Sequence, residues 1–230
     1  MSKMSKHHPS TPATPATPAT HDQPAPQPAA SNSEPAPIIT VRRFAPSDSV
    51  ASLTNLLHRA YAAQVAMGLT PLAGRQDDAT TKSRVFSGEC YVAIHHVHMP
   101  DVDDPSGKGV LPKTQHKIVG SILYHEVEEA EGPAFFHRPD VAWFSQFAVD
   151  PDYQGQGIGQ MLLGIVEHRA IAEHAHELAL SMAEPDTQLM DFYKKRGWRN
   201  VEYWQWPYTN YRSAILSKAL PVRPAHKTKP

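Results

Sequence analysis

The chain of 230 residues carries 22 lysines and arginines against 23 aspartates and glutamates, a formal charge of −1 at pH 7. This balance lacks the basic surplus that nucleic acids and anionic membranes attract, so we expect neither as a partner. The single cysteine, Cys90, excludes an intrachain disulfide. No apolar run approaches the roughly 18–20 residues of a membrane span, and no targeting segment is recognisable. The sequence therefore predicts a cytoplasmic protein and leaves a nuclear location open.

Both ends of the chain differ in composition from its centre. Residues 1–37 hold nine of the 22 prolines and contain no aromatic residue, valine, leucine or isoleucine. Such a segment buries too little apolar surface to offset its chain entropy. We therefore predict a disordered tail rich in proline, alanine and threonine over 1–37, one domain over 38–220, and a short flexible tail over 221–230.

The first half of the predicted domain mixes strands and helices. Apolar residues recur at helical spacing after residues 47–48, which predicts a helix there. In chain order, the predicted elements are a strand over 38–42, this helix, a second helix over 79–86, and strands over 90–97 and 117–127. The polar segment between the last two strands predicts a long hairpin loop.

The second half continues the alternation and predicts a single α/β domain with a mixed sheet. Gly197 is well placed to end a helix, because glycine adopts the left-handed conformation that follows many helix C-termini. In chain order, the predicted elements are a strand over 141–149, a helix over 157–175, a strand over 178–183, a helix over 186–196, and closing strands over 201–206 and 211–217.

The most informative segment joins a strand to a helix through three alternate glycines, Gly155, Gly157 and Gly159. Glycine lets a ligand approach the backbone closely, and the first amides of a helix have no partner within it. Together with the helix dipole, they predict an anion site suited to a diphosphate. A P-loop would need Gly-Lys-Ser/Thr here, and a Rossmann fingerprint would need glycine at Gln160. A tight turn without a ligand would leave Gly159 unexplained, since glycine in a helix costs about 1 kcal/mol relative to alanine.

The helix after this turn has an apolar face. The sequence predicts that its buried stripe consists of Ile158, Met161, Leu162 and Ile165.

The segment Gln154–Gly159 resembles the Arg/Gln-x-x-Gly-x-Gly/Ala motif of the GNAT N-acetyltransferases. The resemblance implies the GNAT-like α/β (α+β) fold, a mixed sheet of six to seven strands with about four helices. It also implies transfer of an acetyl group from acetyl-CoA to a primary amine by direct attack in a ternary complex. The cofactor-binding residues it implies are Phe147, Ala148 and Val149 on the strand, and Gln154, Gly155, Gln156, Gly157, Ile158 and Gly159 in the turn.

A second segment, from Asp186 to Trp198, is similar to the family's Asn-x-x-Ala-x-x-Leu-Tyr-x-x-x-Gly-Phe signature. The resemblance implies that Asp186, in place of the usual asparagine, contacts the cofactor. It also implies that Tyr193 protonates the departing thiolate, and a phenol with a pKa of about 10 suits a thiolate of about 8.5. The alternative is that Tyr193 is a core residue.

The sequence does not identify a general base or an acceptor. Trp143 stands where many family members carry a glutamate, and a water chain to Glu126 or His125 remains open. A non-catalytic acyl-CoA-binding module is therefore the alternative function. The 14 histidines show no zinc spacing, so we expect no metal. The amine acceptor is of unknown type, and the sequence leaves a homodimer open.

Overall fold

The computed structural model describes residues 38–98, 114–125 and 132–221, which belong to a compact unit spanning Ala36–Pro230. The predicted tails, apart from residue 221, lie outside the described residues. The predicted hairpin loop between residues 98 and 114 and the acidic segment that begins at Glu126 lie outside them too.

In the described part of the chain, seven strands form one sheet in the order β1-β2-β3-β4-β5-β7-β6. Their bounds are β1 Ile38–Arg43, β2 Glu89–His98, β3 Thr114–His125, β4 Val141–Val149, β5 Glu177–Ala183, β6 Arg199–Trp204 and β7 Ser213–Ala219. Only the pair β4–β5 is parallel, and the other neighbours are antiparallel. This mixed sheet confirms the predicted fold class.

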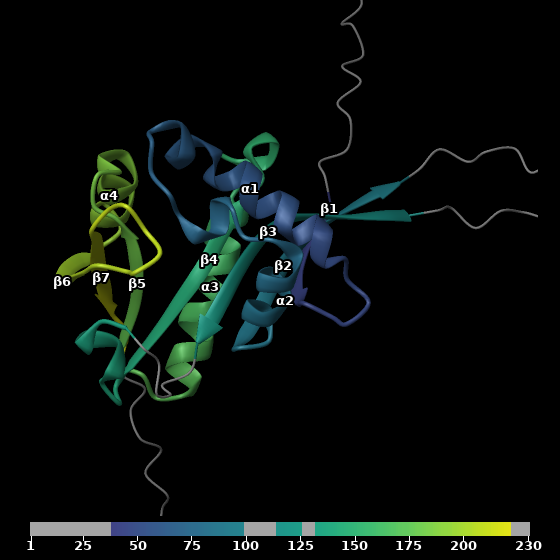
Figure 1. Cartoon of the computed structure of the whole chain (residues 1–230). Coiled ribbons are helices and arrows are strands. Elements are labelled where there is room, and N and C mark those ends of the chain that lie inside the picture. The colour runs from purple at the N-terminus through teal and green to yellow at the C-terminus, as the bar shows by residue number, and fades with distance from the viewer. Residues whose placement is uncertain (1–37, 99–113, 126–131, 222–230) are drawn as a thin grey trace, which may run out of the picture. The chain divides into compact units, whose positions relative to one another are not determined.

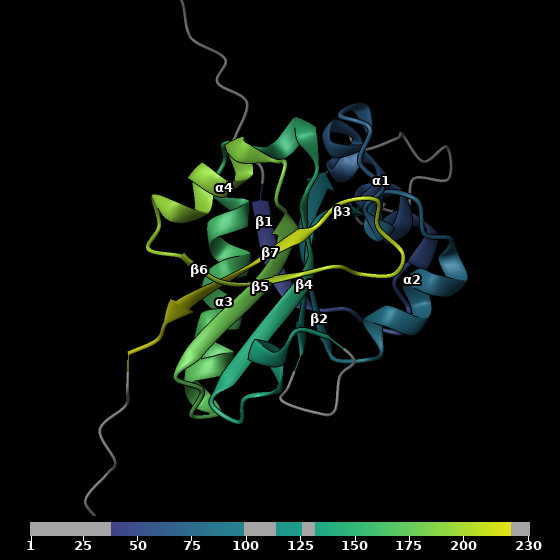
Figure 2. The same ribbon diagram turned by 60° about the vertical axis from the view of Figure 1, so that its left-hand side comes forward.

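The four α-helices among the described residues cover the sheet, with α1 and α2 on one face and α3 and α4 on the other (Figure 2). Their bounds are α1 Val50–Ala66, α2 Asp78–Val85, α3 Ile158–Ala172 and α4 Thr187–Lys194. Short 3₁₀ turns are η1 Leu72–Gly74, η2 Ala134–His137 and η3 Pro151–Tyr153. Helix α3 ends three residues before the predicted position, since His174 already has a φ of 64°. None of the helices in the described part of the chain is long and apolar enough to cross a membrane.

Each face of the sheet has its own core, because neighbouring strand residues point to opposite faces. On one face Leu53 and Leu57 of α1 pack with Leu123 of β3. On the other face Leu162 of α3 packs with Ile122 of β3. Full burial of each such side chain stabilises the fold by about 1.5–3 kcal/mol.

The predicted stripe of α3 was wrong at two positions, because Met161 is exposed and Ile165 is only partly buried. Met161 is 43% exposed, whereas Leu163 and Val166 are buried with Ile158 and Leu162. The buried stripe therefore consists of Ile158, Leu162 and Val166, which are four residues apart, together with Leu163. Met161 lies on the outer side of the helix.

Strands β4 and β5 start side by side and separate toward their carboxyl ends (Figure 1). Their pairing stops at Phe144 and Leu180, although β5 goes on pairing with β7 as far as Ala183. The cause lies in β4, where Gln146 and Phe147 together face one residue of β3 and Gln146 has a φ of 48°. Such a bulge bends a strand away from its neighbour. The edge of β4 that faces β5 is therefore uncovered after Phe144.

Candidate active site

A cavity of 1710 Å³ opens where β4 and β5 separate. Both strands line it, together with α1, the start of α3, α4, and the segment that follows β6. A pocket for one small ligand has about 300–1,000 Å³, so this cavity is large enough for two substrates side by side.

The start of α3 differs from the start of the other α-helices in the described residues. Side-chain oxygens of Ser49, Asp77 and Asp186 cap the N-termini of α1, α2 and α4. The cap residue of α3 is Gly157, which has a φ of 83° and supplies no side-chain hydrogen bond. The first amides of α3 are therefore free to bind an anion, and this end of the helix carries positive partial charge. The turn lines the cavity, which suits it to hold a diphosphate.

Within the glycine turn, Gly159 packs closely against the end of β4. A Cβ atom added at this position would lie 3.3 Å from Cζ of Phe147 and 3.6 Å from Cγ2 of Val149. The start of α3 therefore lies directly against the end of β4. This contact brings the open amides and the uncovered strand edge into one site.

Two side chains that line the cavity donate hydrogen bonds to carbonyl groups on β4. The hydroxyl of Tyr61 donates to the Phe147 carbonyl at 3.3 Å, and the amide of Gln154 donates to the Val149 carbonyl at 3.3 Å. An extended ligand lying along the uncovered edge could form strand-like hydrogen bonds with this backbone. The arrangement fits the pantetheine arm of coenzyme A.

The structure brings most of the predicted cofactor residues together. Those that line the cavity are Phe147, Ala148, Val149, Gln154, Gly155, Gly157, Ile158, Gly159 and Asp186. Gln156 does not line it, because its side chain turns back to donate to the Asp152 carbonyl at 3.4 Å.

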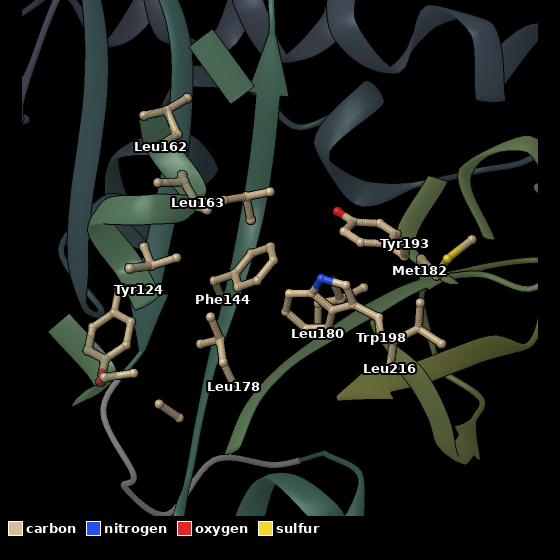
Figure 3. Close-up of a cluster of buried hydrophobic side chains, with 14 of the residues drawn as sticks. Tyr124, Phe144, Leu162, Leu163, Leu178, Leu180, Met182, Tyr193, Trp198 and Leu216 are labelled. Atoms are coloured by element: carbon tan, nitrogen blue, oxygen red, sulfur yellow. The ribbon is translucent and has the colours of Figure 1, made fainter. Parts of the chain in front are cut away.

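Tyr193 lies on the cavity wall and in the core at the same time. Its side chain is 3% exposed and packs edge-on against Trp198, with ring centroids 5.5 Å apart. Its hydroxyl points away from Trp198 (Figure 3). Burial raises the pKa of Tyr193 well above the ordinary phenol value, so the hydroxyl keeps its proton at neutral pH. The same shift makes it a weaker acid than a phenol in water.

Asp186 has a structural task in addition to its place on the cavity wall. One carboxylate oxygen accepts the Leu189 amide at 3.0 Å and caps α4. The other accepts the side-chain amide of Gln64 at 3.0 Å and so links α4 to α1. A contact from Asp186 to a cofactor would have to share these oxygens.

The profile of the acetyltransferase (GNAT) family matches residues 78–198, about half of the chain, including the glycine turn and α4. The chain belongs to the GNAT acetyltransferase family. Members of this family transfer acetyl groups and use acetyl-CoA. A comparison with curated protein sequences found no match.

Solved structures show the same fold at low identity. PH1933 from Pyrococcus horikoshii is 19% identical with a TM-score of 0.54, and the alignment covers 80% of this chain and 100% of that one. The ribosomal-protein-S18-alanine N-acetyltransferase from Escherichia coli is 14% identical with a TM-score of 0.53, covering 82% and 98%. Ard1 from Thermoplasma volcanium is 14% identical with a TM-score of 0.52, covering 80% and 98%.

The GNAT site has no obvious strong base among the described lining residues. His125 stacks on Trp143 with ring centroids 3.7 Å apart, and its Nε2 lies 2.9 Å from Oγ of Ser145. Burial, with a smaller contribution from Arg84, lowers the pKa of His125 to about 3, so it is a weak base at neutral pH. The two carboxylates on the described wall are engaged, Asp186 as above and Glu167 with Lys218. Glu126 lies outside the described residues.

Sequence reasoning missed three residues that shape the GNAT cavity. Tyr61 occupies an apolar position of α1, and its hydroxyl reaches β4. Gln146 is 4% exposed at the bulge, and Arg84 lines the cavity from α2. Only Gln146 gave a local signal, as a polar residue inside a strand of apolar residues. Within the described part of the chain, no group of three or more potential metal ligands lies close enough together to hold an ion.

Proposed function

We propose that the protein transfers an acetyl group from acetyl-CoA to a primary amine by direct attack in a ternary complex. One observation carries the proposal. The uncapped start of α3 and the uncovered edge of β4 meet in a cavity with room for both substrates. Acetyl-CoA supplies the acetyl group and a thiol leaving group.

The residues of the site have different roles in binding and in the reaction. The amides at the start of α3 hold the diphosphate, and the backbone of Phe147 and Val149 aligns the pantetheine arm. The amine nitrogen forms a bond to the thioester carbon, and the carbon–sulfur bond breaks. The amine loses one proton to water, because no free carboxylate lies on the described wall. The thiolate gains one proton, for which the Tyr193 hydroxyl is the candidate donor.

Binding of acetyl-CoA tests the first half of the proposal. A ligand at one hundred times its dissociation constant adds about 2.7 kcal/mol to the stability of the folded state. For a domain of this size, the melting temperature should rise by roughly 5–10 °C. The absence of any shift at millimolar acetyl-CoA would refute the cofactor assignment.

Release of free thiol tests the second half. With acetyl-CoA and a panel of amines, the enzyme should release coenzyme A faster than acetyl-CoA hydrolyses alone. Binding without amine-dependent release would favour the alternative function, a non-catalytic acyl-CoA-binding module. The low pKa of His125, which makes it a weak base, is the observation that supports this alternative.

A further inference from the structure

Arg84 brings a cation to the cavity wall that has no carboxylate partner among the described residues. It lies in the last turn of α2, is partly buried and lines the cavity. Its Nη1 donates to Oε1 of Gln76 at 2.6 Å, and no other hydrogen bond from this side chain to a described residue occurs. A guanidinium has five N–H donors, so most of them remain available to a ligand.

Most other arginines of the described chain pair with a carboxylate, whereas Arg75 and Arg196 are exposed and donate to the carbonyls of Tyr208 and Phe192. Those that pair with an aspartate or glutamate are Arg42, Arg43, Arg59, Arg138, Arg169, Arg199 and Arg212. Arg84 is partly buried and has no such partner among the described residues, and burial lowers its pKa from the ordinary value. A buried cation without a counter-ion is costly, which is typical of a binding group that a ligand neutralises.

The position of Arg84 is fixed relative to the strand edge. Gln76, which is 3% exposed, accepts from Arg84 and donates to Oγ1 of Thr81 at 2.8 Å and to Oε1 of Gln146 at 3.0 Å. Gln146 is the residue at the β4 bulge. A chain of hydrogen bonds therefore joins the guanidinium to the point where β4 leaves β5.

The wall around Arg84 is neutral and aromatic. Tyr61, Tyr208 and His125 line the same cavity as Arg84. Tyr208 stacks on Trp206 with ring centroids 5.6 Å apart, and both line the cavity. Near Arg84, the described wall therefore has a cation that can pair with an anion and aromatic side chains that can pack against an apolar group. It has no free carboxylate that could bind a second ammonium group.

From these observations we infer that the acceptor amine also carries a carboxylate, as an amino acid does, and that Arg84 binds this carboxylate. The inference rests on the proposed function and narrows its acceptor. The guanidinium fork pairs with both oxygens of a carboxylate, which leaves the amine to face the uncovered edge of β4. A polyamine or a lysine in a basic segment would present a cation, and no carboxylate, to Arg84.

Matched acceptors that differ only in the carboxylate test the inference. The full chain is supplied with acetyl-CoA and with phenylalanine or phenethylamine, tyrosine or tyramine, and tryptophan or tryptamine, and kcat/KM is measured by thiol release. A hydrogen-bonded charge pair corresponds to a preference of about 10- to 100-fold for the amino acid in at least one pair. Arg84→Met should reduce this ratio to about one. The control Arg43→Met removes an arginine whose side chain is 63% exposed, on β1, and should keep the ratio.

A binding measurement covers the case in which an Arg84 variant is unstable or no acceptor in the panel turns over. Trp143, Trp204 and Trp206 line the cavity, so their fluorescence should report binding of the amino acids with and without coenzyme A. Binding should weaken in Arg84→Met and, by a smaller factor, in Arg84→Lys, which keeps the charge and loses the fork.

The outcomes are distinct. Equal use of both members of every pair, equal binding by wild type and Arg84→Met, or no binding by wild type overturns the inference. Failure of acetyl-CoA to bind overturns the proposed function instead, while the fluorescence titration without coenzyme A still decides the role of Arg84.

Discussion

At the scale of single residues, burial decides which chemistry a side chain can perform. Tyr193 matches the family signature, yet its ring is packed among core residues and its pKa is raised. His125 faces the cavity, yet burial keeps it neutral at physiological pH. Both residues therefore hold or donate hydrogen bonds more readily than they take up or release a proton.

Tyr193→Phe tests the role of the hydroxyl, because it removes one oxygen and keeps the ring that packs on Trp198. If the phenol protonates the thiolate, kcat should fall about 10²–10⁴-fold. The KM for acetyl-CoA should change little, because the lost interaction forms mainly in the transition state. The free energy of unfolding should fall by about 1 kcal/mol, the scale of one hydrogen bond. Steady-state kinetics and thermal melts measure these quantities.

The control for this experiment is Tyr203→Phe. Tyr203 lies on β6, is 46% exposed and does not line the cavity. An unchanged kcat in Tyr193→Phe, with chemistry shown to limit the rate, would assign Tyr193 to the core alone. A loss of several kcal/mol of stability would mean that the hydroxyl supports the fold and that the kinetic loss says nothing about acid catalysis.

At the scale of elements, the start of α3 combines two features that serve the same ligand. Its N-terminus lacks the side-chain cap that α1, α2 and α4 have, and Gly159 lets it approach β4. A cap would consume the amides that a diphosphate needs, and a side chain at 159 would separate the helix from the strand.

Gly159→Val should therefore abolish the rise in melting temperature that acetyl-CoA causes. The valine side chain would meet Phe147 and Val149 and displace the turn. Overpacking of this kind should also lower the free energy of unfolding by about 1–3 kcal/mol. Met161→Val is the matched control, because it introduces the same β-branched side chain on the exposed side of α3. An acetyl-CoA shift that persists in folded Gly159→Val would contradict the diphosphate assignment.

At the scale of the whole chain, composition predicts where the folded part begins. Residues 1–37 hold no large aliphatic or aromatic residue except Met1 and Met4, so they have little to pack. Deletion of residues 1–36 should change the melting temperature by less than about 1 °C and leave the affinity for acetyl-CoA unchanged. A loss of several degrees on truncation would show that the tail docks and that the domain boundary at residue 38 is wrong.

The sequence by itself determined the features that depend on neighbouring residues. The alternate glycines predicted the turn before α3, and Gly197 predicted the end of α4, where its φ is 84°. The strands and helices were predicted in their correct order, with boundaries shifted by up to three residues. Helical spacing and glycine conformation are local properties, which is why one sequence was sufficient.

The tertiary structure alone decided the features that depend on distant residues. The order β5-β7-β6, the bulge at Gln146 and the outward position of Met161 follow from packing across the sheet. The hydrogen bonds from Arg84 to Gln76 and from Gln76 to Gln146 join α2 to a strand about sixty residues further along the chain. In the sequence, Arg84 is a charge in the last turn of a helix, as many solvent-exposed arginines are. Its burial, and so its value to a ligand, depends on elements that contact it only after the chain has folded.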